Sequence, residues 1–139
     1  MSEQAVAVVR EMLDCFAAGD RESWREQVAE DIVWDTSGTE MPNAGVYHGH
    51  AGVERFFVDW LGTWLDLQID FGELIDGGDQ VVSVFRWSGR GRSSGVETKT
   101  EMYGVYEVRG GKVVGFRQYD TRADAFAAVG LDAGGSDGS

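Results

Sequence analysis

Three stretches of the chain carry apolar residues at the spacing of an amphipathic helix. In the first, a period of three and four residues places the apolar side chains on one helical face, at Val6, Val9, Leu13 and Phe16. Gly19 ends this predicted helix, and Asp20 begins a second, shorter one as its N-cap through Ser23. His50 begins a third helix. Its apolar face repeats with the same period at Val53, Phe56, Phe57, Trp60, Leu61 and Trp64.

Beyond residue 64 the apolar period changes to two, which is the period of a β-strand. Four strands are predicted, over 65–71, 81–88, 97–108 and 113–120. A shorter strand at 32–36 precedes a long connection, 36–49, which contains the one proline, Pro42. Because long connections in small domains are often functional, we interpret this one as a lid.

A fourth helix closes the predicted domain. Thr121 and Asp124 resemble a capping box for it, and Gly130 can end it. The fold class is therefore α+β, with three helices and an early strand followed by four hairpin-linked antiparallel strands. Such a sheet curls, and wrapped around the three N-terminal helices it encloses a cone-shaped cavity. We predict a single domain over residues 1–130 and a flexible tail over 131–139.

Composition and charge narrow the choice of partners. The 139 residues include 12 Lys and Arg against 24 Asp and Glu, which gives a formal net charge of −12. Such a surface repels phosphate backbones and anionic lipid, so we expect no nucleic-acid and no membrane partner. Cys15 is the single cysteine, which excludes an intrachain disulfide and favours a cytoplasmic location. The charged residues near the N-terminus predict neither a signal peptide nor a membrane span.

Five short segments carry a family resemblance. They are FAAGD at 16–20, AEDIVW at 29–34, YHGHAGV at 47–53, GGKVV at 110–114 and FRQYD at 116–120. In this order and spacing the chain resembles the nuclear transport factor 2-like (NTF2-like) superfamily over about residues 5–130. Within it the chain is similar to SnoaL-like proteins, ketosteroid isomerases and limonene epoxide hydrolases. The resemblance implies the cone-shaped fold, but it leaves the activity open because isomerases, hydrolases, cyclases and binding proteins share it.

The catalytic groups of the two named enzyme families lack counterparts at the matching positions. The carboxylate base of the ketosteroid isomerases would fall near Thr36. Their oxyanion-hole tyrosine would fall near Met12, and their protonated aspartate near Tyr103. The two carboxylates of the limonene epoxide hydrolases would fall on Gln118 and near Arg86. The matching positions therefore assign neither chemistry to this chain.

The superfamily register implies which strand side chains face the cavity. It places Arg86 on the concave face of one strand, Glu101 and Tyr103 on the next, and Gln118 and Asp120 on the last. The rest of the predicted pocket lining is Phe16, Trp34, Thr36, Phe56, Trp60, Val84, Val105 and Phe116. An aromatic pocket with a few convergent polar groups is typical of a small-molecule site. We therefore predict a small hydrophobic or aromatic ligand and no cofactor.

These polar residues suggest a candidate chemistry. Arg86 can fix a ligand carboxylate or enolate through a forked pair of hydrogen bonds, while Asp120 or Glu101 takes up a proton and Tyr103 and Gln118 act as anchors. This arrangement predicts a cofactor-independent enzyme of the isomerase, hydrolase or cyclase type. The alternative is a non-catalytic ligand-binding or accessory module, in which Arg86 neutralises Glu101 or Asp120 as a buried ion pair. A third interpretation is a protein-interaction domain that binds its partner through the exposed sheet.

Metal chemistry is not predicted. His48 and His50 lie two residues apart, which is not the helix spacing of zinc ligands, so we interpret them as cap and loop residues. Asp35 is expected to be solvated, unless the first strand shifts by one residue and turns this side chain inward.

The opposite strand face is predicted to be apolar and exposed. It would carry Phe85, Trp87, Met102, Gly104 and Tyr106. A small monomer rarely exposes so large an apolar surface. Because members of the resembled superfamily commonly pair through the convex face of the sheet, we predict a homodimer that buries it.

Overall fold

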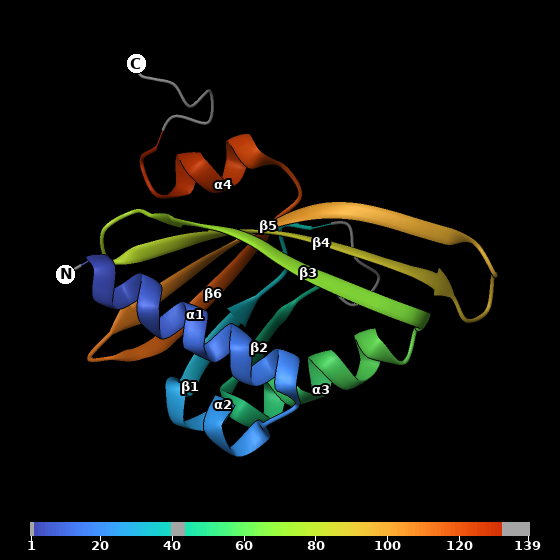
Figure 1. Ribbon diagram of the computed structural model, residues 1–139, viewed down its shortest axis with the longest axis horizontal. Helices are drawn as coiled ribbons and strands as arrows, with labels where there is room; N and C mark the ends of the chain where they lie inside the picture. Colours follow the sequence, from blue (N-terminus) through green and yellow to red (C-terminus); the bar gives the residue numbers. More distant parts are fainter. Residues whose placement is uncertain (1, 40–43, 132–139) are drawn as a thin grey trace.

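Four helices and six strands make up the part of the chain that the computed structural model describes, residues 2–39 and 44–131. The helices are α1 (Ser2–Ala18), α2 (Arg21–Gln27), α3 (Gly49–Leu61) and α4 (Arg122–Ala128) (Figure 1). The strands are β1 (Val28–Asp35), β2 (Val46–His48), β3 (Trp64–Asp76), β4 (Gln80–Gly91), β5 (Glu97–Arg109) and β6 (Lys112–Tyr119). Pro42 and residues 132–139 of the predicted tail lie outside the described residues, so the lid and the flexible tail stay predictions.

The helix boundaries follow the capping signals of the sequence. Gly19 has a φ of 73° directly after α1, a left-handed conformation that glycine adopts without steric cost. The Asp20 carboxylate accepts a hydrogen bond from the backbone N–H of Ser23 at 3.2 Å and so caps α2. Thr121 caps α4 in the same way, accepting from the N–H of Asp124 at 3.2 Å. Both predicted caps are confirmed.

The strands form one sheet in the order β2-β1-β6-β5-β4-β3. Strands β3 to β6 are the predicted antiparallel meander. The prediction of an antiparallel sheet is wrong at β1, which runs parallel to β6 and places Trp34 opposite Phe116. Strand β2 pairs with β1 inside the connection predicted to be a loop. Neither pairing follows from a hairpin turn signal in the sequence, and the partners of the parallel pair lie far apart along the chain.

The sheet bends around α1, α2 and α3, whereas α4 lies on its other side (Figure 1). Irregularities in the β3–β4 pairing, between Leu65 and Gln68 and between Phe71 and Leu74, account for part of this bend. A β-bulge adds a residue to one strand, which increases the local twist and bends that strand. The predicted fold class, a curved sheet wrapped around three N-terminal helices with a short C-terminal helix, is confirmed.

Two buried clusters lie on opposite faces of the same strands. In β4, Val81 belongs to the cluster that includes α1, whereas its neighbour Val82 packs with Phe126 of α4. In β5, Tyr106 and Val105 divide between the two clusters in the same way. Because successive strand residues point to opposite faces, these pairs assign every position of β4 and β5 to the concave or the convex side.

Candidate functional site

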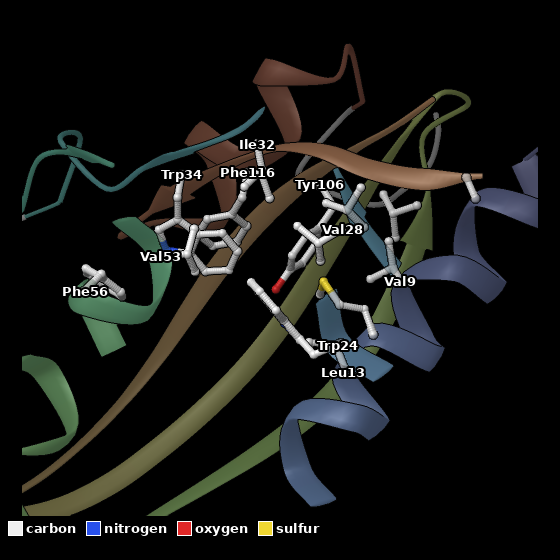
Figure 2. Packing of buried hydrophobic residues seen from close by; sticks show 14 residues of the cluster. Val9, Leu13, Trp24, Val28, Ile32, Trp34, Val53, Phe56, Tyr106 and Phe116 are labelled. Carbon is white, nitrogen blue, oxygen red and sulfur yellow. The ribbon is translucent and has the colours of Figure 1, made fainter. Parts of the chain in front are cut away.

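The concave face and the N-terminal helices enclose a narrow aromatic cavity, here called the inner cavity. About 50 Å³ of it is open to the centres of water molecules, and about 540 Å³ lies empty between the lining atoms when the open mouth is included. Every helix except α4 and every strand except β2 contributes to its walls. The lining includes Leu13, Phe16, Trp34, Phe56, Tyr106 and Phe116, most of which are seen in Figure 2.

Stacked rings form one wall of the inner cavity. The Trp34 ring lies on the Phe116 ring with 4.0 Å between the centroids and 25° between the planes (Figure 2). Phe116 also contacts Tyr106, with ring centroids 4.7 Å apart. Behind this stack, a Cβ atom on Gly104 would lie 2.4 Å from the Phe116 ring. The wall therefore requires a residue without a side chain at position 104.

The polar groups of the inner cavity are uncharged. Gln118 is 7 % exposed and lines the cavity together with the phenol of Tyr106. Burial raises the pKa of Tyr106 above its ordinary value, so this phenol stays protonated at neutral pH. The indole Nε1 of Trp34 is buried and has no hydrogen-bond partner among the described residues. The described lining residues include no Asp, Glu, His, Lys or Arg.

The sequence model of the SnoaL-like domain family matches residues 9–116, which is more than half of the chain. The chain belongs to the SnoaL-like domain family. This finding confirms the resemblance inferred from the five sequence segments. No protein in the set of curated sequences matches the chain.

Solved structures share this SnoaL-like fold. An NTF2-like protein from Burkholderia xenovorans is 25 % identical, with a TM-score of 0.73 over 93 % of this chain and 97 % of that one. TerC, co-crystallised with polyporic acid, is 16 % identical, with a TM-score of 0.71 over 91 % and 98 %. Rv0760c from Mycobacterium tuberculosis, in complex with estradiol-17β-hemisuccinate, is 20 % identical, with a TM-score of 0.67 over 88 % and 96 %. Two of these relatives were therefore solved with a small molecule.

Most of the predicted aromatic lining lies in the cavity of this SnoaL-like domain. The predicted residues found there are Phe16, Trp34, Phe56, Trp60, Phe116 and Gln118. Thr36 is fully buried but is not among the lining residues. Its hydroxyl accepts from the Gly45 N–H at 3.1 Å and lies 3.2 Å from the Gly45 carbonyl oxygen, so it fixes the loop after β1.

The predicted placement of the β4 and β5 residues in the cavity is wrong. Val84 and Val105 pack on the convex side in the cluster of α4. Arg86 and Glu101 are paired across the two strands, and Tyr103 stands opposite Val84. All of them share the face of Val84, because they lie two residues apart along their strands or directly opposite each other. In β4 and β5 the side chains are therefore shifted by one residue from the register that the resemblance implied.

On the convex face these polar residues form a surface cluster. Arg86 Nε lies 2.9 Å from Glu101 Oε1, and the Arg86 side chain is 63 % exposed. The Tyr103 hydroxyl donates to the other carboxylate oxygen of Glu101. This hydrogen bond, with the charge of Arg86, lowers the pKa of Glu101 despite some desolvation. The predicted ion pair exists, but it is a solvated pair outside the cavity, and such pairs contribute little to stability.

Asp120 and the predicted outward face also differ from expectation. Asp120 is exposed just beyond the end of β6 and is not among the lining residues of the inner cavity.

The prediction that one strand face is exposed and apolar is wrong. Its residues are buried or half-buried on the concave side, and they are Phe85, Trp87, Met102, Gly104 and Tyr106. They therefore cannot form the surface of a homodimer.

A signal in the sequence could have found the missed lining residues. Strand β3 alternates cleanly, with Ile69 and Phe71 on one face and Asp70 on the other. Its antiparallel partner β4 places Phe85 opposite Phe71 and Arg86 opposite Asp70. Because directly opposed side chains share a face, the apolar face of β3 assigns Phe85 to the interior and Arg86 to solvent. The lining residues that the sequence analysis missed include Leu13, Phe57, Ile69, Phe71, Phe85 and Tyr106.

The structure places both histidines around the start of α3 and gives His50 and Asp35 hydrogen-bond partners. His48 occupies the N-cap position of α3 without a side-chain capping bond, and His50 Nε2 lies 2.9 Å from the Val28 carbonyl oxygen. Asp35 is half-buried and accepts from the N–H and hydroxyl of Ser37. The described residues contain no group of three or more His, Cys, Asp or Glu side chains that could hold a metal ion. None of the described helices is long and apolar enough to cross a membrane.

A second hollow, here called the outer groove, lies between α1, α2 and α3. Its volume is about 320 Å³ on the measure that gives about 50 Å³ for the inner cavity. It shares Phe16, Trp24 and Phe57 with the inner cavity, and the Phe16 and Phe57 rings contact each other with centroids 4.9 Å apart. The same three side chains therefore border both spaces. Arg21 and Glu54 also line the outer groove.

We expect Glu54→Gln to weaken the contact between α2 and α3 in a pH-dependent manner. Glu54 pairs with Arg25 at 2.5 Å and with Arg21 at 3.1 Å. Burial raises the pKa of Glu54, but the hydrogen bond and charge of Arg25 and the charge of Arg21 outweigh it, so the pKa is lowered. A lowered pKa in the folded state contributes stability above the unfolded pKa of about 4.3, and that contribution is lost as pH falls through the folded value.

Urea unfolding of the wild type and Glu54→Gln, at pH 7 and at successively lower pH, measures this effect. The wild type should be more stable at pH 7 by no more than about 1 kcal/mol, because the pair is partly exposed. The difference should shrink below pH 4. Glu97→Gln, which changes an exposed carboxylate at the start of β5, serves as the control. A difference that grows on acidification contradicts the assignment.

Proposed function

We propose that this SnoaL-like domain binds a flat, apolar small molecule in its inner cavity. The observation that carries the proposal is the lining, which is aromatic or aliphatic apart from the single amide of Gln118. Transfer of apolar surface from water into such a site stabilises the complex by about 25 cal/mol per Å². A cavity with an apolar lining and a few polar groups is the usual form of a small-molecule site.

The shape of the site favours a flat ligand. The wall is built of stacked and tilted rings, and little space remains between it and the helices. Because only about 50 Å³ of the cavity is free, any ring-sized ligand must displace side chains. A planar ring system needs the smaller displacement, since it can stack on these faces, whereas a bulky aliphatic ligand would have to displace several buried rings. Movement of Phe16 or Phe57, which are half-buried, would join the inner cavity to the outer groove and lengthen the site.

Binding without catalysis fits the described residues better than acid–base chemistry. A general acid or base must reach the reacting atom and titrate near the working pH. Tyr106 is the only ordinarily titratable side chain among the described lining residues, and its pKa is raised by burial. The catalytic roles predicted for Asp120, Glu101 and Arg86 remain predictions without support from their positions. We therefore favour the ligand-binding alternative over an isomerase, hydrolase or cyclase.

The relatives support a small-molecule site in general terms. TerC was crystallised with polyporic acid, and Rv0760c with estradiol-17β-hemisuccinate. Their identities to this chain, 16 % and 20 %, support a common fold and transfer neither ligand. What supports the site in this chain is its own lining.

Titration with N-phenyl-1-naphthylamine, a neutral aromatic dye, tests the proposal. Trp24, Trp34 and Trp60 line the cavity, so binding should quench tryptophan fluorescence as the dye emission rises. Ile69→Trp fills the cavity from a half-buried position and should weaken binding at least about tenfold, equivalent to about 1.4 kcal/mol. Arg86→Gln on the convex face should leave the affinity unchanged. Binding that is absent in the wild type, or lost in Arg86→Gln alone, contradicts the proposal.

We also propose a homodimer through the convex sheet face, carried by charged residues rather than by the apolar patch first predicted. A shallow groove of about 480 Å³ on the β3–β4–β5 side includes Asp70, Arg86, Lys99 and Glu101. In a two-fold dimer the same patch meets its own copy, so two cations and two carboxylates make it self-complementary. Sedimentation should find a dimer that Arg86→Glu dissociates. A monomer at micromolar concentration would refute it.

For location we propose the cytoplasm. Cys15 supports this as a free, half-buried thiol in a chain that has no second cysteine. Cell fractionation should recover the protein with cytosolic markers, and recovery in an exported fraction would contradict the proposal.

A further inference from the structure

One buried donor on the wall of the inner cavity lacks a partner. The structure leaves three buried polar side-chain atoms without a hydrogen bond among the described residues: Trp34 Nε1, Trp64 Nε1 and Ser83 Oγ. Of these residues, Trp34 alone lines the inner cavity. A buried N–H that forgoes its hydrogen bond costs free energy, so each such group in a native protein calls for an explanation.

The Trp34 indole is held in place and is not free to turn toward another acceptor. Its ring is stacked on Phe116 and makes a T-shaped contact with the ring of Phe57, with 5.5 Å between the centroids and 65° between the planes. The residue is 4 % exposed. Rotation of the ring would break the stack and clash with close-packed neighbours. Because Nε1 itself has almost no accessible surface, an acceptor reaches it when a half-buried neighbour of the ring, such as Phe57, moves aside.

The surroundings of Trp34 decide the chemistry of that acceptor. The described residues that line the cavity carry no positive charge, so a carboxylate or phenolate bound there would be buried without a counter-ion. Burial of an unpaired anion costs far more than one hydrogen bond returns. An uncharged carbonyl oxygen avoids that cost and accepts readily from an indole N–H. The group that matches Trp34 is therefore a ketone or quinone oxygen.

We propose that Trp34 is the specificity-determining residue of the inner cavity and donates its indole N–H to an uncharged carbonyl oxygen of a flat aromatic ligand. This inference rests on the proposed function, because it names the ligand class of the same site. It assigns flat aromatic ketones and quinones as ligands, in preference to the corresponding hydrocarbons and to the corresponding carboxylates.

Two probes of almost equal shape test the proposal: 9-fluorenone, which carries a carbonyl, and fluorene, which carries a methylene group in its place. Competition of each with N-phenyl-1-naphthylamine gives both affinities in the wild type and in Trp34→Phe. The substitution removes the N–H and keeps an aromatic ring. The ratio of fluorenone affinity to fluorene affinity should fall about tenfold in Trp34→Phe, the size expected for one lost hydrogen bond. Comparing ratios cancels the general loss of packing.

Trp64→Phe is the matched control. It also removes a buried indole N–H without a partner, but Trp64 does not line the inner cavity. Its ratio should equal that of the wild type. If both probes bind and the ratio is the same in Trp34→Phe, the role of Trp34 is overturned while the binding function stands. If neither probe binds the wild type, the proposed function itself fails.

A second measurement is made on the wild-type protein and does not depend on whether a variant folds. In ¹⁵N-labelled wild-type protein, fluorenone should shift the indole N–H resonance of Trp34 downfield, as a new hydrogen bond does, whereas fluorene should not. A resonance that responds equally to both probes indicates that the N–H rests against the face of a ring such as Phe57, a weak interaction that no ligand replaces. That result would also overturn the proposal.

Discussion

Replacing Gly104 with valine is expected to lower the free energy of unfolding by about 3 kcal/mol or more. A Cβ atom at this position would lie 2.4 Å from Phe116 Cε1 and 3.0 Å from Phe116 Cζ. The Phe116 ring cannot withdraw easily, because it is stacked on Trp34 and packed against Tyr106. Intrinsic propensity predicts the opposite sign, since valine is favoured over glycine in strands. Urea unfolding of the two proteins measures the difference.

A control and a compensating change make this prediction specific. Gly115→Ala in the neighbouring strand places its Cβ no closer than 3.6 Å to another atom, an ordinary contact, and should cost less than about 1 kcal/mol. In a double-mutant cycle, Phe116→Leu should offset part of the cost of Gly104→Ala, because the smaller side chain vacates the space that Cβ needs. Additive effects in that cycle, or a Gly104→Val protein as stable as the wild type, would contradict the ring stack behind position 104.

The local elements of this fold were predictable because their signals lie within a few residues of one another. The spacing of Val9 and Leu13 determines the buried face of α1, and Asp20 caps α2 through a residue three positions away. The meander follows from hairpin turns in the same way. The parallel pairing of β1 with β6 joins Trp34 to Phe116 across most of the chain. No turn signal determines such a pairing, and it depends on how the whole sheet closes over the helices.

The candidate site was only partly predictable because the centre of the sheet is covered on both faces. In β4, residues 81–84 are all buried, since α1 packs on one side and α4 on the other. Where both faces are apolar, alternation of hydrophobic and polar residues does not say which face looks inward. The resemblance then determined the choice, and it placed Arg86 inside. Past the end of α4 the convex face meets solvent. There the alternation of Phe85, Arg86 and Trp87 shows which side chains point into the cavity and which point to solvent.

The second large effect on stability is expected in the hydrophobic cluster between α4 and the convex face of the sheet. Phe126→Ala should lower the free energy of unfolding by about 3 kcal/mol or more, because Phe126 is 5 % exposed and packs in the cluster with Val82 and Val84. Helix α4 has seven residues, too few to be stable without such an anchor. Arg122→Gln removes the contact of the guanidinium with the Phe126 ring at 4.6 Å and a positive charge that acts on Glu101, and it should cost no more than about 1 kcal/mol. Thermal and urea unfolding of both variants give the comparison.

The same variant separates the two faces of the sheet. If Val84 and Val105 lie under α4 and not in the inner cavity, loosening of α4 should leave the affinity of the folded Phe126→Ala protein for N-phenyl-1-naphthylamine unchanged. Affinity should instead fall in Phe71→Ala, which removes a ring from the cavity wall on the concave side. A loss of dye binding in Phe126→Ala at temperatures well below its unfolding transition would mean that the two faces are coupled. Because mutations without shared partners usually have additive effects, the changes caused by Phe126→Ala and Phe71→Ala should add in the double variant.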